Sequence, residues 1–114
     1  MIDVGVIGLG LIGGSISMNF AQGLNVAGFD VDPHTMELAC QKKAITYPIT
    51  HLEELSPAKL IFVATPPRFV PDIVSRLNEI VRPDTVITDC SSVKQSIFEN
   101  EKRGEYKKFL RHLF

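Results

Sequence analysis

GLGLIGGS, at residues 8–15, follows the apolar-rich residues 2–7 without a break. A short apolar run of this kind predicts a buried strand, and the residues from Leu11 to about Ala21 have the apolar spacing of a helix. The apolar residues expected together on one side of that helix are Leu11, Ile12, Ile16 and Phe20. Four glycines therefore fall at the junction between a predicted strand and a predicted helix.

The glycines fit the pattern G-x-G-x-x-G with Gly8, Gly10 and Gly13. In dinucleotide-binding proteins this pattern lies between a strand and a helix, and each glycine has a separate task. The first allows a tight turn, the second leaves room for a pyrophosphate against the backbone, and the third lets the helix pack closely on the sheet. The positive end of the helix, at Leu11 and Ile12, is then expected to face the phosphates.

An acidic residue closes the second predicted strand, which runs from Val26 to Asp30. Asp30 lies 20 residues after Gly10, where a carboxylate accepts hydrogen bonds from the ribose hydroxyls of adenosine. Its charge, together with that of Asp32, would repel the 2′-phosphate of NADP, and no Lys or Arg follows before Lys42. We therefore expect NAD rather than NADP as the cofactor.

The rest of the chain alternates short apolar runs with amphipathic stretches, which is the pattern of a parallel sheet built from crossover units. Asp32 is expected to cap a helix that Pro33 opens, whereas residues 44–50 predict only a weak strand because Pro48 interrupts them. The remaining predicted elements are strands at 60–64 and 86–88 and helices at 35–43, 70–81 and 93–103. The expected fold class is α/β, a doubly wound parallel sheet of the Rossmann type.

Ligands of doubly wound sheets lie across the carboxyl ends of the strands. Residues 64–67 and 89–94, which follow two predicted strands, should therefore line the site. Ser91 and Ser92 can also serve as N-caps of the helix that begins near Val93, and a capping hydroxyl can at the same time face a nicotinamide ring. The residues expected to contact the cofactor are Gly8, Leu9, Gly10, Leu11, Ile12, Gly13, Asp30, Val31, Ala64, Thr65, Pro66, Pro67, Ser91 and Ser92.

Composition argues against several classes of protein. At 114 residues and 45% hydrophobic content, the chain predicts a single domain over residues 1–114. A net charge of -1 gives no basic footprint for nucleic acid, and no apolar stretch is long enough for a membrane span. Cys40 and Cys90 have no partners at metal-ligand spacing, so we expect two buried thiols and no metal site. The start of the chain has no targeting pattern, which favours a cytoplasmic location.

The chain resembles the N-terminal nucleotide-binding domain of prephenate and arogenate dehydrogenases, the enzymes of tyrosine biosynthesis, in three segments: VGVIGLGLIGGSIS at 4–17, VATPP at 63–67 and ITDCSSVKQSI at 87–97. The resemblance covers essentially the whole chain, and its most specific part is the D-x-x-S-V-K form that begins at Asp89. It implies NAD as the cofactor and an oxidative decarboxylation. In that reaction a hydroxyl-bearing ring carbon gives hydride to NAD, and carboxylate leaves as CO2 while the ring becomes aromatic.

The resemblance also implies roles for individual residues. Ser92 would support catalysis beside a histidine of an H-P motif that has no match in this chain; His34, His51 and His112 are expected to be exposed surface residues instead. The helical domain that binds substrate and makes the dimer contacts is likewise absent, and the apolar residues up to Phe114 lead us to expect a fragment cut near its sixth strand. Such a fragment should bind NAD without catalysing the oxidation of prephenate or arogenate, and the full-length enzyme would be a homodimer.

Two other functions share some of these features. The nucleotide domain of a β-hydroxyacid dehydrogenase has a similar opening, but a Thr and a Pro would follow the serine where this chain has Val93 and Lys94. A non-catalytic NAD-sensing domain would share the glycine turn and Asp30, but it has no reason to carry Ser91 and Ser92 at the nicotinamide end. Both differences favour the dehydrogenase of tyrosine biosynthesis.

Overall fold

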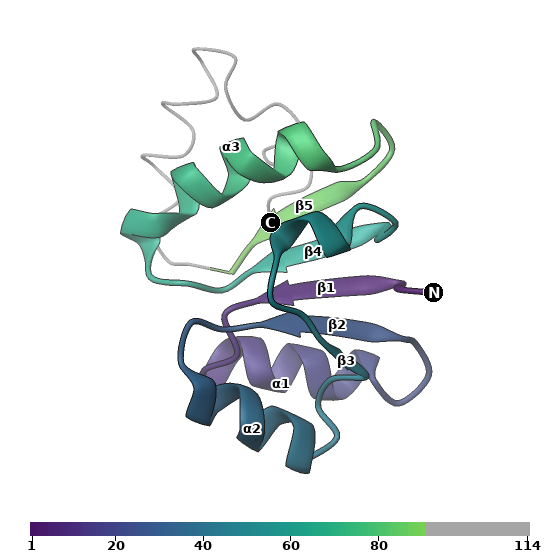
Figure 1. The fold of residues 1–114 in the computed structure, drawn as a ribbon, viewed down its shortest axis with the longest axis vertical. Helices are drawn as coiled ribbons and strands as arrows, with labels where there is room; N and C mark the ends of the chain where they lie inside the picture. Colours follow the sequence, from purple (N-terminus) through teal and green to yellow (C-terminus); the bar gives the residue numbers. More distant parts are fainter. Residues whose placement is uncertain (91–114) are drawn as a thin grey trace.

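A computed structural model describes residues 1–90 of the 114-residue chain. Five parallel strands form one sheet in the order β3-β2-β1-β4-β5, with helices packed on it (Figure 1). The strands are β1 (Val4–Ile7), β2 (Val26–Phe29), β3 (Tyr47–Pro48), β4 (Leu60–Val63) and β5 (Val86–Asp89). The helices are α1 (Leu11–Phe20), α2 (Pro33–Gln41) and α3 (Val70–Ile80), with two 3₁₀ turns, η1 (Leu52–Leu55) and η2 (Pro67–Phe69). The expected doubly wound α/β fold is confirmed.

The strand order reverses at β1, which lies between β2 and β4. The register aligns Ile7 with Phe29 and Val63, and Val63 in turn with Asp89. Four strands therefore end at the same level, and the segments that follow them meet at one edge of the sheet. In open α/β sheets, the crevice at such a reversal is where ligands bind.

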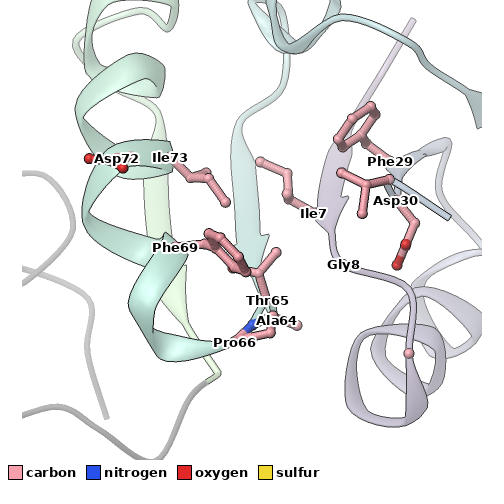
Figure 2. Close-up of a pocket in the computed structure, with 12 residues that line it drawn as sticks. Ile7, Gly8, Phe29, Asp30, Ala64, Thr65, Pro66, Phe69, Asp72 and Ile73 are labelled. Atoms are coloured by element: carbon pink, nitrogen blue, oxygen red, sulfur yellow. The ribbon is translucent and has the colours of Figure 1, made fainter.

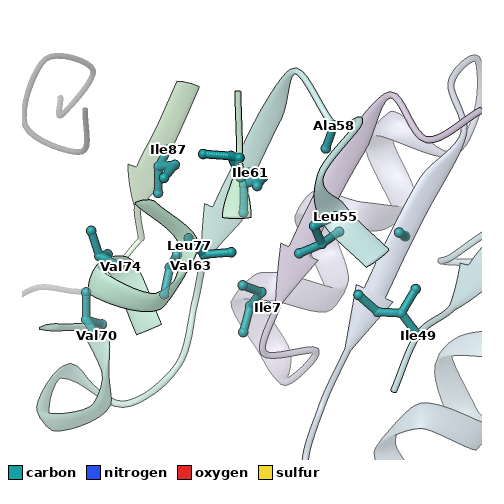
Figure 3. Packing of buried hydrophobic residues seen from close by; sticks show 12 residues of the cluster. Ile7, Ile49, Leu55, Ala58, Ile61, Val63, Val70, Val74, Leu77 and Ile87 are labelled. Atoms are coloured by element: carbon teal, nitrogen blue, oxygen red, sulfur yellow. The ribbon is translucent and has the colours of Figure 1, made fainter. Parts of the chain in front are cut away.

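Alternation along the strands sends side chains to two separate cores. On β1, Val4 and Val6 belong to one cluster of buried residues and Ile7 to the other; on β4, Ile61 and Val63 face the cluster that contains Ile7. The cluster with Ile7 also contains Leu55, Val70, Val74, Leu77 and Ile87, so α3 and η1 cover this face (Figure 3). The opposite face is covered by α1 and α2. A parallel sheet covered on both faces explains why its strands are almost entirely apolar.

The expected packing of α1 is confirmed for Ile16 and Phe20, which pack against the core, and is wrong for Leu11 and Ile12. Leu11 is 89% exposed and Ile12 57% exposed, whereas Gly13 and Ser17 are buried. Glycine and serine bring the backbone of α1 close to the sheet, because they have the smallest side chains of the helix. Leu11 and Ile12 begin the helix beyond the ends of the strands, where no core lies beneath them.

Two further expectations are corrected. Cys40 is exposed and Cys90 is partly exposed, so neither is the buried thiol that its apolar character predicted. Cys40 lies on α2, where Ala39 is the buried residue and its neighbour faces outward. The weak strand at 44–50 shortens to Tyr47–Pro48 at the edge of the sheet.

The expectations for Asp32 and for two of the histidines are confirmed. Asp32 caps α2 by accepting a hydrogen bond from the His34 N–H at 3.0 Å. His34 and His51 are exposed, as expected. His112 and the predicted helix at 93–103 lie outside the described residues. Within residues 1–90, no helix combines the length and apolar character that crossing a membrane requires.

The turn η1 is fixed by charged groups on the surface. Glu54 accepts hydrogen bonds from the N–H groups of Thr50 and His51, and these bonds lower the pKa of its carboxyl group. Glu53 pairs with Arg76 of α3, which lowers the pKa of Glu53 as well. The Glu53–Arg76 pair joins η1 to α3 at the surface, and Leu55 at the end of the same turn is buried in the core.

Leu55→Ala is expected to lower the free energy of unfolding by about 2–5 kcal/mol, because the leucine is fully buried and its removal leaves a cavity under β1 and β4. Leu24→Ala, the same change at a side chain that is 44% exposed, should cost less than about 1 kcal/mol. Urea denaturation followed by circular dichroism measures both variants. Equal losses would contradict the assignment of Leu55 to the core.

Candidate functional site

The turn from β1 into α1 lies directly against the end of β4. Gly8 has a φ of 91°, a backbone conformation that side chains other than glycine rarely adopt. A Cβ at this position would lie 2.8 Å from the carbonyl oxygen of Ala64 and 3.0 Å from the nitrogen of Thr65. Gly8 is therefore required by both its conformation and its close approach to the strand end.

The third glycine of the pattern holds the helix on this turn. A Cβ on Gly13 would overlap the carbonyl oxygen of Gly8 and press on the side chain of Ala64. By contrast, a Cβ on Gly10 would meet nothing within 4 Å. Gly10 thus leaves an open cradle above the backbone, as expected of the position that a pyrophosphate approaches.

The amino end of α1 opens into this cradle. Gly10 is the N-cap, and it makes no side-chain hydrogen bond to the helix. The first turn carries no acidic residue that would offset the positive end of the helix dipole. Because the first N–H groups of a helix have no partners within it, this end is suited to bind an anion.

The carboxylate of Asp30 is held in place by the backbone on both sides. One oxygen accepts a hydrogen bond from the N–H of Leu9 at 2.8 Å, and the other accepts one from the N–H of Asp32 at 2.9 Å. Each carboxylate oxygen has a second lone pair, so the group can still accept hydrogen bonds from a ligand. The end of β2 is therefore tied to the glycine turn by the residue predicted to hold a ribose.

Two cavities flank the cradle, each of about 510 Å³. Cavity 1 lies between the ends of β1, β2 and β4 and the start of α3 (Figure 2). It is lined by Ile7, Gly8, Gly10, Phe29, Asp30, Val31, Ala64, Thr65, Pro66, Phe69, Asp72 and Ile73. Cavity 2 lies on the other side of Thr65 and is lined by Gly10, Leu11, Ile12, Ala64, Thr65, Pro66, Pro67 and Cys90.

Most of the predicted cofactor residues that the structure describes line one or both cavities. The exceptions are Leu9, which is 6% exposed and packs in the core, and Gly13, which lies beneath the turn. Both support the site from behind. Ser91 and Ser92 lie outside the described residues.

Sequence reasoning missed one wall of cavity 1. Phe69 and Ile73 extend from η2 and α3 toward Ile7 and Phe29 and make this cavity strongly apolar (Figure 2). Phe69 is 45% exposed, an unusual state for a large aromatic side chain. The available signal was the spacing of four residues between Phe69 and Ile73, which places them on one side of a helix.

The charged residues that line cavity 1 are both acidic, Asp30 and Asp72. Among the lining residues of the two cavities in the described part of the chain, none is Lys or Arg. Residues 1–90 also contain no cluster of three or more His, Cys, Asp or Glu side chains that could hold a metal ion. The site offers a helix end, a fixed carboxylate and apolar walls.

These features agree with a comparison against protein families. Residues 19–109 match the family described as "Prephenate dehydrogenase, nucleotide-binding domain". The chain belongs to this family. The match favours the resemblance to prephenate dehydrogenases over the β-hydroxyacid dehydrogenase alternative.

Solved structures support the same assignment. Arogenate dehydrogenase from Synechocystis is 30% identical, with a TM-score of 0.81 over 90% of this chain and 37% of that one. Prephenate dehydrogenase from A. aeolicus, solved in complex with hydroxyphenyl propionate and NAD+, is 25% identical, with a TM-score of 0.83 over 96% of this chain and 40% of that one. The chain thus spans about two fifths of the length of these prephenate and arogenate dehydrogenases, and the bound NAD+ agrees with the expected cofactor.

A more distant structure shows the fold alone. 3-Hydroxybutyryl-CoA dehydrogenase from Escherichia coli is 22% identical, with a TM-score of 0.70 over 80% of this chain and 25% of that one. A comparison with curated protein sequences gives no match. The family assignment therefore comes from the family match, and the closely similar dehydrogenase structures support it.

Gly13→Ala should destabilise the domain by about 2 kcal/mol or more, because the new methyl group overlaps the backbone of the glycine turn. At a solvent-exposed helix position the same change would stabilise the protein by up to about 1 kcal/mol. A loss of stability in Gly13→Ala would therefore come from this contact. Gly10→Ala should change the stability by less than about 1 kcal/mol, because its Cβ meets nothing. Thermal unfolding of both variants tests this contrast, and a stable Gly13→Ala protein would contradict the close packing of α1.

Proposed function

We propose that this domain binds NAD across the two cavities, with the pyrophosphate on the amino end of α1. The observation that carries the proposal is the position of Asp30: its carboxylate is fixed beside the open cradle at Gly10, and both residues line cavity 1. A fixed acceptor beside an uncapped helix end fits a ribose joined to a phosphate. The overlapping fold of the NAD+-containing dehydrogenase from A. aeolicus supports this placement.

The adenosine half would occupy cavity 1. Phe69 and Ile73 on one side and Phe29 on the other give apolar walls of the kind that an aromatic base needs. The nicotinamide half would extend past Thr65 into cavity 2, toward the end of β5 at Asp89. The residues after Asp89, including Ser91 and Ser92, would continue the site at that end.

The charges of cavity 1 favour NAD over NADP. A 2′-phosphate would lie next to the carboxylate of Asp30, which repels it, and Asp32, whose carboxylate caps α2 two residues further on, adds a second negative charge. NADP-binding domains place an arginine where it can accommodate this phosphate, and the described lining of cavity 1 contains none. We infer that the domain prefers NAD as much because it repels the 2′-phosphate of NADP as because it binds the ribose of NAD.

In the full-length protein we infer that this domain serves a prephenate or arogenate dehydrogenase of tyrosine biosynthesis, a cytoplasmic homodimer. When bound, NAD would accept the hydride that leaves the substrate ring as CO2 departs. The residues of this domain bind the cofactor, orient its nicotinamide end toward cavity 2 and exclude water with apolar walls. Ser92 would support the substrate hydroxyl, and the 114-residue chain alone would bind NAD without catalysis.

Isothermal titration of the 114-residue chain with NAD and NADP tests the proposal. NAD should bind at least tenfold more tightly than NADP, because two carboxylates oppose the additional phosphate. Gly10→Ala should lose most of the NAD affinity while the protein stays folded, because its methyl group fills the cradle that the pyrophosphate needs. Undiminished NAD binding by this variant would show that the cofactor does not lie on α1.

Asp30→Asn should weaken NAD binding by about tenfold or more, because hydrogen bonds from the ribose to a charged acceptor contribute about 1.5–3 kcal/mol. Asp30→Asn should also reduce the difference in affinity between NAD and NADP. Asp32→Asn is the matched control: it removes an equal charge two residues away, and asparagine can still cap α2. Equal losses in the two variants would mean that the carboxylate of Asp30 acts only through its general charge and does not hold the ribose.

A further inference from the structure

Four residues line both cavities: Gly10, Ala64, Thr65 and Pro66. Any ligand that occupies the two cavities at once must pass these residues. Glycine, alanine and proline have no side-chain hydrogen-bonding group, so Thr65 alone among them can recognise polar atoms of the ligand through its side chain. Among the described residues that line both cavities, only Thr65 can therefore hydrogen-bond the connecting part of a ligand through its side chain.

The hydroxyl of Thr65 has a second unusual property. Its Oγ1 is withdrawn from solvent and has no hydrogen-bond partner among the described residues. Two buried hydroxyls elsewhere in the fold have partners: Thr85 donates to the carbonyl of Ala58 at 3.0 Å, and Ser17 donates to that of Gly14 at 3.0 Å. A buried hydroxyl without a partner destabilises the protein that carries it, so its retention needs an explanation.

We propose that the hydroxyl of Thr65 binds the part of the dinucleotide that joins the two cavities, namely the pyrophosphate and the ribose beyond it. Thr65 is thereby a specificity residue that favours dinucleotides over mononucleotides. The inference rests on the proposed binding of NAD. It adds which side chain binds the pyrophosphate and ribose that join the adenosine and nicotinamide halves. An adenine mononucleotide, which fills cavity 1 alone, gains nothing from this hydroxyl.

The proposed contact follows from the position of Thr65 and requires one bond rotation. Thr65 follows β4 and lies at the rim of cavity 1, between Ala64 and the ring of Phe69 (Figure 2). The backbone nitrogen of Thr65 lies directly against the glycine turn. Rotation about the Cα–Cβ bond exchanges the methyl and hydroxyl groups between staggered positions and can bring the hydroxyl out of its buried position. In the free protein the hydroxyl lacks a partner, and a bound dinucleotide supplies one.

Thr65→Val tests the role of the hydroxyl in the free protein and in the dinucleotide-bound protein, because valine keeps the shape of threonine and removes the hydroxyl. The free variant should unfold at a urea concentration equal to or above that of the wild type, since no hydrogen bond is lost. Its affinities for NAD and for ADP-ribose should each fall roughly tenfold, while its affinity for AMP stays the same. Isothermal titration with these three nucleotides measures the pattern.

Thr85→Val is the matched control. It removes a buried hydroxyl that does have a partner, at the end of β5 opposite to the cavities, so it should lower the unfolding midpoint and leave NAD affinity unchanged. Should Thr65→Val fold poorly, Thr65→Ser and Thr65→Ala form a second pair that differs only in the hydroxyl. The serine variant should bind NAD roughly tenfold more tightly than the alanine variant.

The outcomes distinguish this inference from the proposed function. Wild-type protein that binds no NAD overturns the proposed function and the inference with it. Wild-type binding with equal NAD affinity in Thr65→Val overturns the inference alone. A lower unfolding midpoint in Thr65→Val shows that the hydroxyl is already bonded in the free protein, and an equal loss of AMP affinity places its contact in cavity 1; either result overturns the inference.

Discussion

The architecture of the site depends on a contact between two pieces of backbone: the carbonyl of Gly8 lies against the bare Cα of Gly13. This contact sets how closely α1 approaches the sheet, and so where its positive end lies relative to the strand ends. Asp30 completes the arrangement, because its carboxylate bonds the N–H of Leu9 inside the same turn. One side chain thus joins the second strand to the glycine turn and remains available to a ligand.

Much of this could be predicted from the sequence because glycine spacing has few physical solutions. Gly8 must be glycine because it has a φ of 91° beside another backbone segment. Gly13 must be glycine because a backbone carbonyl occupies the place of its Cβ. The apolar runs predicted the strands for a similar reason, since a parallel sheet covered on both faces favours apolar residues at most of its positions. Asp30 follows from its distance along the chain from the glycines.

What could not be predicted depends on tertiary position. Leu11 and Ile12 have the spacing of a buried helical face, yet they lie past the ends of the strands and are exposed. Cys40 is exposed because α2 buries little besides Ala39, a fact that local composition does not reveal. Phe69 and Ile73 belong to the site only because the crossover packs α3 on β4, with its start across cavity 1 from the ends of β1 and β2. The catalytic role expected of Ser92 stays a prediction, since this residue lies outside the described part of the chain.

The shortest strand has a consequence for how far the sheet can grow. The N–H of Ile49 donates a hydrogen bond to the carbonyl of Gly28 on β2. Because backbone groups alternate sides along a strand, those of the preceding residue, Pro48, point away from β2 toward the outer edge of the sheet. Proline has no amide hydrogen to offer there, and the paired part of β3 spans only two residues. An incoming chain would find no continuous row of hydrogen-bonding groups along β3, which disfavours edge-on aggregation at this side of the described sheet.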